Sequence, residues 1–296
     1  MKPAQIITVI ASIAALVSCN KEQKAIHNHD AAPVHNSITS KTIKPNGPLT
    51  ADKLINDFIE RRKKIEAALP SLTKEQANAL YESYYNENEK KLIVLDSLEH
   101  NVLENYYRYY QAYDGSTVAP PDSIQKKEAR LAKAGLHFWE LGEGYVEITT
   151  VYNFYLELFN GYVTADYQRY LEITAEDNKE LYSADAGIII PFKAVGNRML
   201  AWENYIAAYP KSNLLARAKE FYKMYQADYL VGQDNTPTID DQSAELYPEN
   251  RAELNSFLAA HPDSPTTRLI KIVLNYKGSD NELFAIIENE QKAMGL

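Results

Sequence analysis

A long stretch without helix-breaking residues constrains the fold of this chain most. From Thr73 to Asp114 the sequence contains neither proline nor glycine, and its apolar residues recur at intervals of three and four. Thr73 and Gln76 are spaced as a capping box at the start of the segment. The pattern predicts one helix of about forty residues, beyond the usual length of about 8–20. Its apolar stripe consists of Leu80, Tyr84, Leu92, Leu95, Leu98, Val102, Tyr106, Tyr109 and Tyr113.

A second helical segment precedes this one. Thr50 is placed as its N-cap, and Pro70 ends the pattern. Leu54, Ile55 and Phe58 begin an apolar face at helical spacing between these two positions. We expect the two helices to pack against each other as an N-terminal helical hairpin over residues 49–114.

The remainder of the chain also has a helical pattern. Gly115–Ser123 is rich in residues that break helices and marks a candidate boundary before a domain over residues 123–296. We assign even the β-branched segment Val146–Val151 to a helix, because Ile148 and Tyr155 share a helical face. The sequence therefore predicts an all-α protein. The expected helices span residues 123–141, 145–160, 164–176, 188–209, 213–229, 249–260, 265–277 and 280–293.

Two short segments repeat in the C-terminal third. Tyr205–Ser212 (YIAAYPKS) and Phe257–Ser264 (FLAAHPDS) share two alanines, a ring, a proline and a serine in the same order. In each copy the alanines end a helix, the proline stops it, and the serine caps the next helix. Each copy therefore predicts a helix–turn–helix unit.

This repeated segment resembles the turn signature of tetratricopeptide-type repeats in bacterial envelope lipoproteins, a class that includes outer-membrane assembly factors. The resemblance covers residues 196–296 and implies stacked helical hairpins with a concave binding face. The copies lie 52 residues apart, whereas a tetratricopeptide repeat has about 34 residues. The 18 residues of Val231–Pro248 account for the difference. Unrelated helical hairpins can reach the same turn independently, and that alternative stays open.

The N-terminus has the layout of a secretory signal. Lys2 carries a positive charge, Ile6–Val17 is an apolar run of twelve residues, and the small Ser18 precedes the only cysteine. Twelve residues are too few to cross a bilayer, which needs about 20. Leu16–Cys19 resembles the lipobox of bacterial lipoproteins, which implies cleavage of residues 1–18 after Ser18 and lipidation of Cys19. An ordinary secretory signal with an incidental cysteine is the alternative.

A segment with few large apolar residues follows the cysteine. Residues 19–48 lack a helical period, and we expect them to form a flexible tether. With the lipidated cysteine, this layout predicts an envelope protein held on a membrane, with the outer membrane as the expected location. Without residues 1–18 the chain has 30 basic and 40 acidic residues. No basic patch with interleaved aromatic residues is present, which argues against a nucleic-acid partner.

One short motif points to chemistry. Gly135, His137 and Glu140 match the G-x-H-x-x-E motif of imelysin-like lipoproteins, which are helical envelope proteins linked to metal uptake or peptidase activity. On a helix, His137 and Glu140 would share a face and could ligate a metal together. The alternative is a partly buried, hydrogen-bonded His137 beside Trp139. We assign no catalytic residue, metal or cofactor.

The preferred hypothesis is a binding module. Val231–Pro248 is acidic, contains no basic residue and is long for a loop in a compact repeat. We expect this segment and the adjacent helix ends to contact an envelope protein or an extended ligand with a basic or polar face. An imelysin-like metal-handling or hydrolytic lipoprotein is the alternative function. The expected surface residues are Trp202, Tyr225, Tyr229, Asp234, Asp240 and Asp241.

Overall fold

The computed structural model describes residues 48–240 and 242–296. The described residues on both sides of Gly115–Ser123 belong to one unit. Ser18, Cys19, the predicted signal peptide, the predicted tether up to residue 47, and Asp241 lie outside the described residues. Within the described ranges, none of the helices combines the length and the apolar character needed to cross a membrane.

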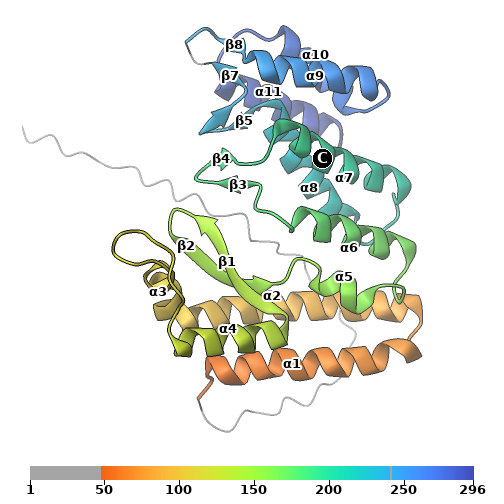
Figure 1. The fold of residues 1–296 in the computed structure, drawn as a ribbon. Coiled ribbons are helices and arrows are strands. Elements are labelled where there is room, and N and C mark those ends of the chain that lie inside the picture. Colours follow the sequence, from red (N-terminus) through yellow and green to blue (C-terminus); the bar gives the residue numbers. More distant parts are fainter. Residues whose placement is uncertain (1–47, 241) are drawn as a thin grey trace, which may run out of the picture. The chain divides into compact units, whose positions relative to one another are not determined.

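Helices dominate the described residues, accounting for 64% of the structure against 11% for strands. This confirms the prediction of a mainly helical chain, because an average domain has about 20–25% strand. Short antiparallel hairpins join several of the helices (Figure 1). The helices are α1 (Ala51–Ala68), α2 (Lys74–Glu104), α3 (Tyr106–Tyr110), α4 (Asp122–Ala134), α5 (Phe154–Phe159), α6 (Ala165–Asp177), α7 (Phe192–Ala208), α8 (Leu215–Leu230), α9 (Pro248–Ala260), α10 (Thr266–Asn275) and α11 (Asp280–Ala293). The strands are β1 (Leu136–Gly142), β2 (Tyr145–Thr150), β3 (Ser183–Ala184), β4 (Gly187–Ile188), β5 (Gly232–Gln233), β6 (Thr236–Pro237), β7 (Ile239–Asp240) and β8 (Glu245–Leu246).

The first two helices begin where the sequence predicts. The Thr50 hydroxyl accepts a hydrogen bond from the Lys53 N–H at 3.3 Å and caps α1. At the start of α2, the Thr73 hydroxyl accepts from the Gln76 N–H at 3.3 Å. The Gln76 side chain accepts from the Thr73 N–H at 2.9 Å and completes the capping box. These bonds satisfy backbone donors that the first helical turn leaves without a partner.

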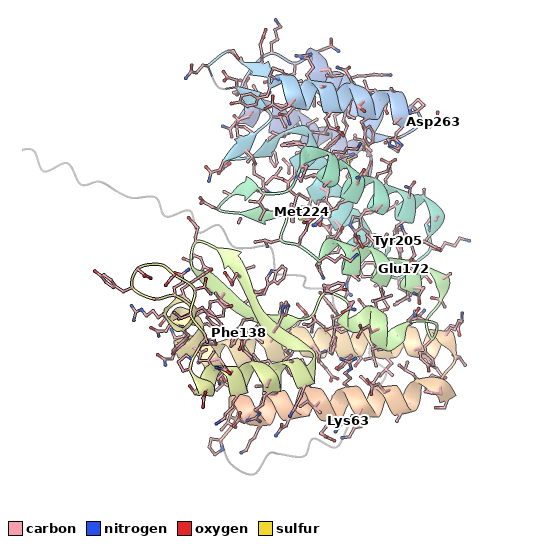
Figure 2. The ribbon with its side chains drawn as sticks, in the orientation of Figure 1. Lys63, Phe138, Glu172, Tyr205, Met224 and Asp263 are labelled. Atoms are coloured by element: carbon pink, nitrogen blue, oxygen red, sulfur yellow. The ribbon has the colours of Figure 1, made fainter. Side chains whose placement is uncertain are left out.

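The single long helix predicted over this region is divided into α2 and α3. After Glu104, Asn105 takes φ −104° and ψ 11° and leaves the helical conformation. Its side-chain amide donates to the Asn101 carbonyl at 2.8 Å, a local bond by which asparagine competes with helix propagation. Beyond this break, the Tyr106 ring lies 5.5 Å from the ring of Phe138, which Figure 2 labels on the β1–β2 hairpin.

Residues 136–150 form a β-hairpin, and the prediction of helix here is wrong. At its turn, Gly142 and Gly144 take φ of 93° and 82°, which glycine adopts readily and a helix excludes. Ile148 faces the core, and its N–H donates to Asp96 Oδ1 of α2 at 2.9 Å. The predicted helical face joined Ile148 to Tyr155. These two residues belong to different elements, β2 and α5, which only a short turn separates.

Successive helices are joined at two different edges (Figure 1). Short turns join α1 to α2, α5 to α6, α7 to α8 and α9 to α10, at the right of the view. Hairpins at the left of the view join α4 to α5 (β1–β2), α6 to α7 (β3–β4) and α8 to α9 (β5–β6 and β7–β8). The segment Val231–Pro248, which sequence reasoning treated as an insert, therefore forms the last two hairpins.

The two Pro-Ser turns are built alike. As predicted, α7 and α9 each end at the second alanine of the repeated segment. Ser212 Oγ accepts from the backbone N–H two residues on at 3.2 Å and donates to Asp166 Oδ2 at 2.5 Å. Ser264 Oγ accepts from the equivalent N–H at 3.1 Å and donates to Glu203 Oε2 at 2.8 Å. Each serine therefore closes its turn and ties that turn to a carboxylate on an earlier helix. The prediction that the serines cap the next helices is wrong, because the N-cap residues of α8 and α10 are Leu214 and Pro265.

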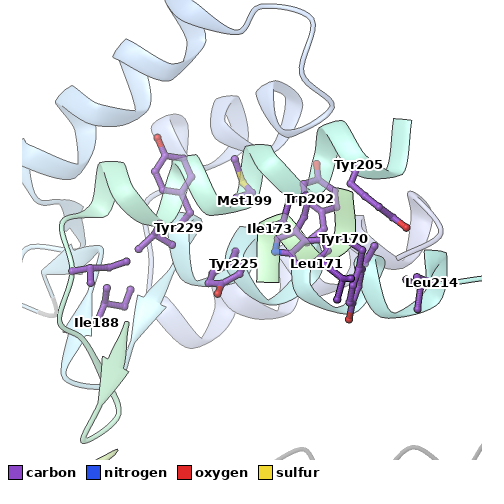
Figure 3. Close-up of a cluster of buried hydrophobic side chains, with 14 of the residues drawn as sticks. Tyr170, Leu171, Ile173, Ile188, Met199, Trp202, Tyr205, Leu214, Tyr225 and Tyr229 are labelled. Atoms are coloured by element: carbon purple, nitrogen blue, oxygen red, sulfur yellow. The ribbon is translucent and has the colours of Figure 1, made fainter. Parts of the chain in front are cut away.

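The larger core is rich in tyrosine and includes Trp202 at its centre (Figure 3). Trp202 of α7 is fully buried, and its ring stacks on Phe221 of α8 with centroids 4.7 Å apart. Tyr170 of α6 and Tyr205 of α7 meet the same indole edge-on at 5.3 and 6.0 Å. Such aromatic pairs add to the stabilisation from buried area, and they hold α6, α7 and α8 together.

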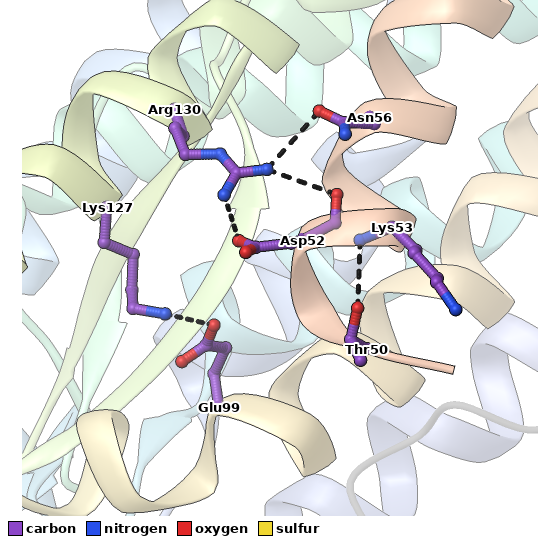
Figure 4. A network of polar contacts seen from close by, with 7 residues as sticks. All are labelled: Thr50, Asp52, Lys53, Asn56, Glu99, Lys127 and Arg130. Atoms are coloured by element: carbon purple, nitrogen blue, oxygen red, sulfur yellow. Dashed lines mark hydrogen bonds and ion pairs between the residues drawn. The ribbon is translucent and has the colours of Figure 1, made fainter. Parts of the chain in front are cut away.

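A smaller core joins α1, α2, α4 and the inner face of the β1–β2 hairpin. Ion pairs border this core (Figure 4). Lys127 of α4 pairs with Glu99 of α2, which is only 5% exposed, and Arg130 of α4 pairs with Asp52 of α1. Because a buried carboxylate is strongly unfavourable without a partner, Lys127 fixes α4 against α2.

Candidate functional site

Three of the predicted surface residues belong to the core. Trp202, Tyr225 and Tyr229 are 0%, 3% and 1% exposed, because α7 and α8 are packed between other helices and bury the faces that carry these rings. The prediction that they supply a binding surface is therefore wrong. Asp234 is exposed and Asp240 is partly exposed, on the hairpins that follow α8.

The structure does not bring His137 and Glu140 together as a metal site. Both residues lie on β1, where side chains alternate and residues three apart point to opposite faces. Glu140 accepts hydrogen bonds from the Tyr106 and Tyr107 hydroxyls at 3.2 and 2.9 Å. Burial lowers the pKa of His137, whose ring lies 5.3 Å from that of Trp139. No cluster of three or more His, Cys, Asp or Glu residues suited to a metal occurs within 48–240 and 242–296.

The hairpins carry nearly all of the net charge. We define the hairpin edge as Leu136–Thr150, Ser183–Ile188 and Gly232–Leu246, and these segments contain neither lysine nor arginine. They hold eight of the 40 acidic residues, so the rest of the chain has 32 acidic residues against 31 basic ones. The net charge of −9 is therefore concentrated on the hairpin edge. Its acidic residues are Glu140, Glu143, Glu147, Asp185, Asp234, Asp240 and Glu245, together with Asp241, which is counted from the sequence alone.

Neighbouring hairpins of this edge touch each other. The Asn235 N–H, in the turn of β5–β6, donates to the Ala186 carbonyl of the β3–β4 turn at 2.9 Å. On the other side, a Cβ at Gly142 would lie 2.9 Å from the Cβ of Ala184. Glycine at that position therefore lets the β1–β2 turn approach the β3–β4 turn closely. The acidic groups of three hairpins thus belong to one surface.

The turns present charge beside exposed apolar side chains. Hydrogen bonding and like-charge repulsion from Asp185 raise the pKa of Glu143 on the adjacent turn. Two carboxylates held this close favour the approach of a cation. Tyr145, Leu141 and Ile189, at or beside these turns, are 68%, 36% and 57% exposed. This combination suits a partner segment that carries both basic and apolar residues.

A buried polar cluster lies beneath two of the hairpins. Asp177 ends α6, and Asp228 lies near the end of α8. Burial raises the pKa of both carboxyl groups from 3.8 to about 6. We name this cluster the polar junction, and its members are Asp177, Tyr182, Arg198, Tyr225, Asp228 and Gln233.

Sequence reasoning found only part of the hairpin edge. It assigned Val231–Pro248 to the surface because that segment is acidic and lacks basic residues. Leu136–Thr150 shows the same signal, with three glutamates and no basic residue, but the helical assignment concealed it. No sequence pattern could have identified the polar junction, because its members are distributed over α6, α7, α8 and two hairpins.

Comparison of the chain with protein-family models, with curated proteins and with solved structures gave no match. Charge distribution and geometry therefore carry the functional argument.

Proposed function

We propose that this protein is a lipid-anchored envelope protein whose helical layers present the hairpin edge to a basic segment of another envelope protein. The segregation of charge carries the proposal: the hairpin edge has eight acidic residues and no basic residue, and the rest of the chain is nearly neutral. A surface of one sign steers a partner of the opposite sign and orients it on contact. Exposed Tyr145 and Ile189 add apolar contact area beside the charges.

We further infer that the helical layers form a repeat array of the tetratricopeptide-like type. The two Pro-Ser turns support this, because Ser212 and Ser264 make equivalent hydrogen bonds to Asp166 and Glu203 on earlier helices. In repeat arrays each unit packs mainly on its neighbours. The hairpins on the opposite edge distinguish this array from plain helix–turn–helix repeats.

The membrane attachment rests on the lipobox-like segment Leu16–Cys19. Each buried methylene of an acyl chain contributes about 0.8 kcal/mol to membrane binding, so two or three chains give a stable anchor. Cys19→Ala is expected to move the protein from the membrane fraction to the soluble fraction of envelope preparations. Mass spectrometry of the mature protein should find an acylated Cys19 at its N-terminus. A Cys19→Ala protein that stays with the membranes would contradict the anchor.

The hairpin edge is tested by reversing its charge. A photoreactive amino acid at Tyr145, which is 68% exposed, is used to crosslink partners in native envelopes. The double variant Glu143→Lys/Asp234→Lys is expected to reduce the crosslinked yield about tenfold, because like charges now face the partner. The crosslinked partner peptide, identified by mass spectrometry, should contain an excess of lysine and arginine.

A matched variant separates the hairpin edge from net charge. Glu75→Lys/Asp263→Lys makes the same change of charge at exposed positions on the turn edge. This variant should crosslink as the unaltered protein does, and circular dichroism should show equal helix content in all three proteins. Equal losses in the two double variants, or a partner peptide without basic residues, would reject the hairpin edge as the binding surface.

A further inference from the structure

One buried carboxylate holds two hairpins at once. Asp228 Oδ2, on α8, accepts a hydrogen bond from Gln233 Nε2 of β5 at 2.8 Å. The same oxygen accepts from the hydroxyl of Tyr182, which directly precedes β3, at 3.3 Å. Ser183 of β3 also donates to Gln233 Oε1 at 2.6 Å. The base of β3–β4 and the base of β5–β6 therefore meet at Asp228.

A second buried carboxylate belongs to the same cluster. Asp177 Oδ2 accepts from Trp202 Nε1 at 2.9 Å, and Asp177 Oδ1 lies 3.8 Å from Arg198 Nε. The Arg198 guanidinium lies over the rings of Tyr182 and Tyr225 at 5.6 and 5.9 Å. Arg198 thus connects Asp177 to the tyrosine that bonds Asp228.

Besides Arg198, the charged neighbour that shifts the pKa of Asp177 is acidic. Glu176 precedes it on α6 and raises its pKa. The Glu180 carboxylate lies 3.7 Å from Arg198 Nη2 and competes for the guanidinium. The side chains that hydrogen-bond Asp228, those of Tyr182 and Gln233, carry no charge. Neither carboxylate therefore has a cation of its own at hydrogen-bond distance.

Burial is the largest cause of the raised pKa of both carboxyl groups, about 6 against 3.8 in the ordinary case. When the junction opens, water solvates the carboxylates and the pKa returns toward 3.8. The closed junction therefore holds a proton at a pH where the open junction has lost it. The stabilisation of the closed junction is therefore fully present below pH 3.8, is lost as the pH rises from 3.8 through 6, and does not change further at higher pH.

We propose that the polar junction is an acid-strengthened joint that fixes β3–β4 and β5–β6 to α8. Protonation of Asp228, which bonds both hairpins directly, holds them firmly, and its ionisation loosens them. Asp177 reaches the hairpins only through Arg198 and Tyr182 and contributes less to their protection. The joint is a property of this chain alone. Its effect on partner binding, by setting the stiffness of the hairpin edge, rests on the function proposed above.

The test is hydrogen–deuterium exchange of the full mature chain in the absence of a partner, at pH 5.0 and 7.5. Protection factors, corrected for the intrinsic exchange rate at each pH, should be about tenfold higher at pH 5.0 for residues 183–188 and 232–237. Asp228→Asn keeps the shape of the side chain and cannot titrate, so it should reduce this ratio to less than about twofold. Asp234→Asn, at the exposed turn of the same hairpin, should keep the tenfold ratio.

Trp202 provides an independent measurement, because its indole N–H bonds Asp177. In a Trp139→Phe background, Trp202 fluorescence should titrate with a midpoint near pH 6, and Asp177→Asn should abolish the transition. A midpoint near 3.8, or a hairpin protection ratio that Asp228→Asn leaves unchanged, would overturn the joint. Neither result bears on partner capture, so failure of the joint and failure of the proposed function are distinguishable.

Discussion

Replacing Trp202 with alanine is expected to lower the free energy of unfolding by about 3–5 kcal/mol. The indole is fully buried, so its removal leaves a cavity between α7 and α8 and breaks the ring contacts with Phe221, Tyr170 and Tyr205. The substitution also removes the N–H that bonds Asp177, which leaves a buried carboxylate short of a partner. Urea unfolding followed by far-UV circular dichroism measures the loss.

The second tryptophan serves as the control. Trp139 is only partly buried on β1, and Trp139→Ala should lower the free energy of unfolding by about 1 kcal/mol. Trp202→Phe keeps most of the ring volume but loses the N–H, so we expect a loss of about 1–3 kcal/mol. Equal losses for Trp139→Ala and Trp202→Ala would contradict the central position of Trp202.

Gly232→Ala is expected to destabilise the chain by about 3–4 kcal/mol and to disrupt β5–β6. Gly232 has φ 86°, and an added Cβ would lie 2.2 Å from the Thr236 carbonyl oxygen and 2.9 Å from Pro237 Cα. A left-handed conformation alone costs a non-glycine residue about 1–2 kcal/mol. The remainder comes from displacement of the β6 backbone, which cannot turn away as a flexible side chain can. Urea unfolding gives the change in stability, and crosslinking from Tyr145 reports on the hairpin edge.

Gly144 offers a matched comparison for this effect. It has φ 82°, and nothing lies within 4 Å of an added Cβ. Gly144→Ala therefore carries only the strain of the left-handed conformation, about 1–2 kcal/mol. If the two glycine substitutions had the same effect on stability, the close contact between Gly232 and Thr236 would not exist in solution.

Local sequence rules predicted the helix starts and stops well. Thr50 and Thr73 cap the first turns of α1 and α2, and Gln76 completes the capping box of α2. Such a cap depends only on a few adjacent residues, so the sequence alone can predict it. The alanines before Pro210 and Pro262 end α7 and α9 for the same local reason. The break at Asn105 was missed. Its side chain bonds the Asn101 carbonyl in competition with the helical backbone bonds, and the sequence does not show which of the two patterns forms.

The hairpins could not be separated from helices by spacing alone. Ile148 is buried because β2 packs on α2, and the Asp96 carboxylate that receives its N–H is 52 residues away. The aromatic residues of α7 and α8 were misplaced for a related reason. Helical spacing identifies a face, but only the packing of other helices decides whether that face is buried, as it is for Trp202 and Tyr229. Composition needs no assignment of local structure. It correctly indicated that the acidic segment around Asp234 lies at the surface.

The separation of turns and hairpins onto opposite edges affects how such a chain can diversify. On the turn edge, Ser212 and Ser264 are bonded to carboxylates of earlier helices, so an insertion there would shift one layer against the next. The opposite edge already contains strands of two residues in β3 and of seven in β1, and two hairpins in succession between α8 and α9. Mutation can lengthen, shorten or duplicate hairpins at that rim while the helices keep their register. Protein engineers can use the same rim, with the open turn at Gly144 as the natural position for a grafted loop.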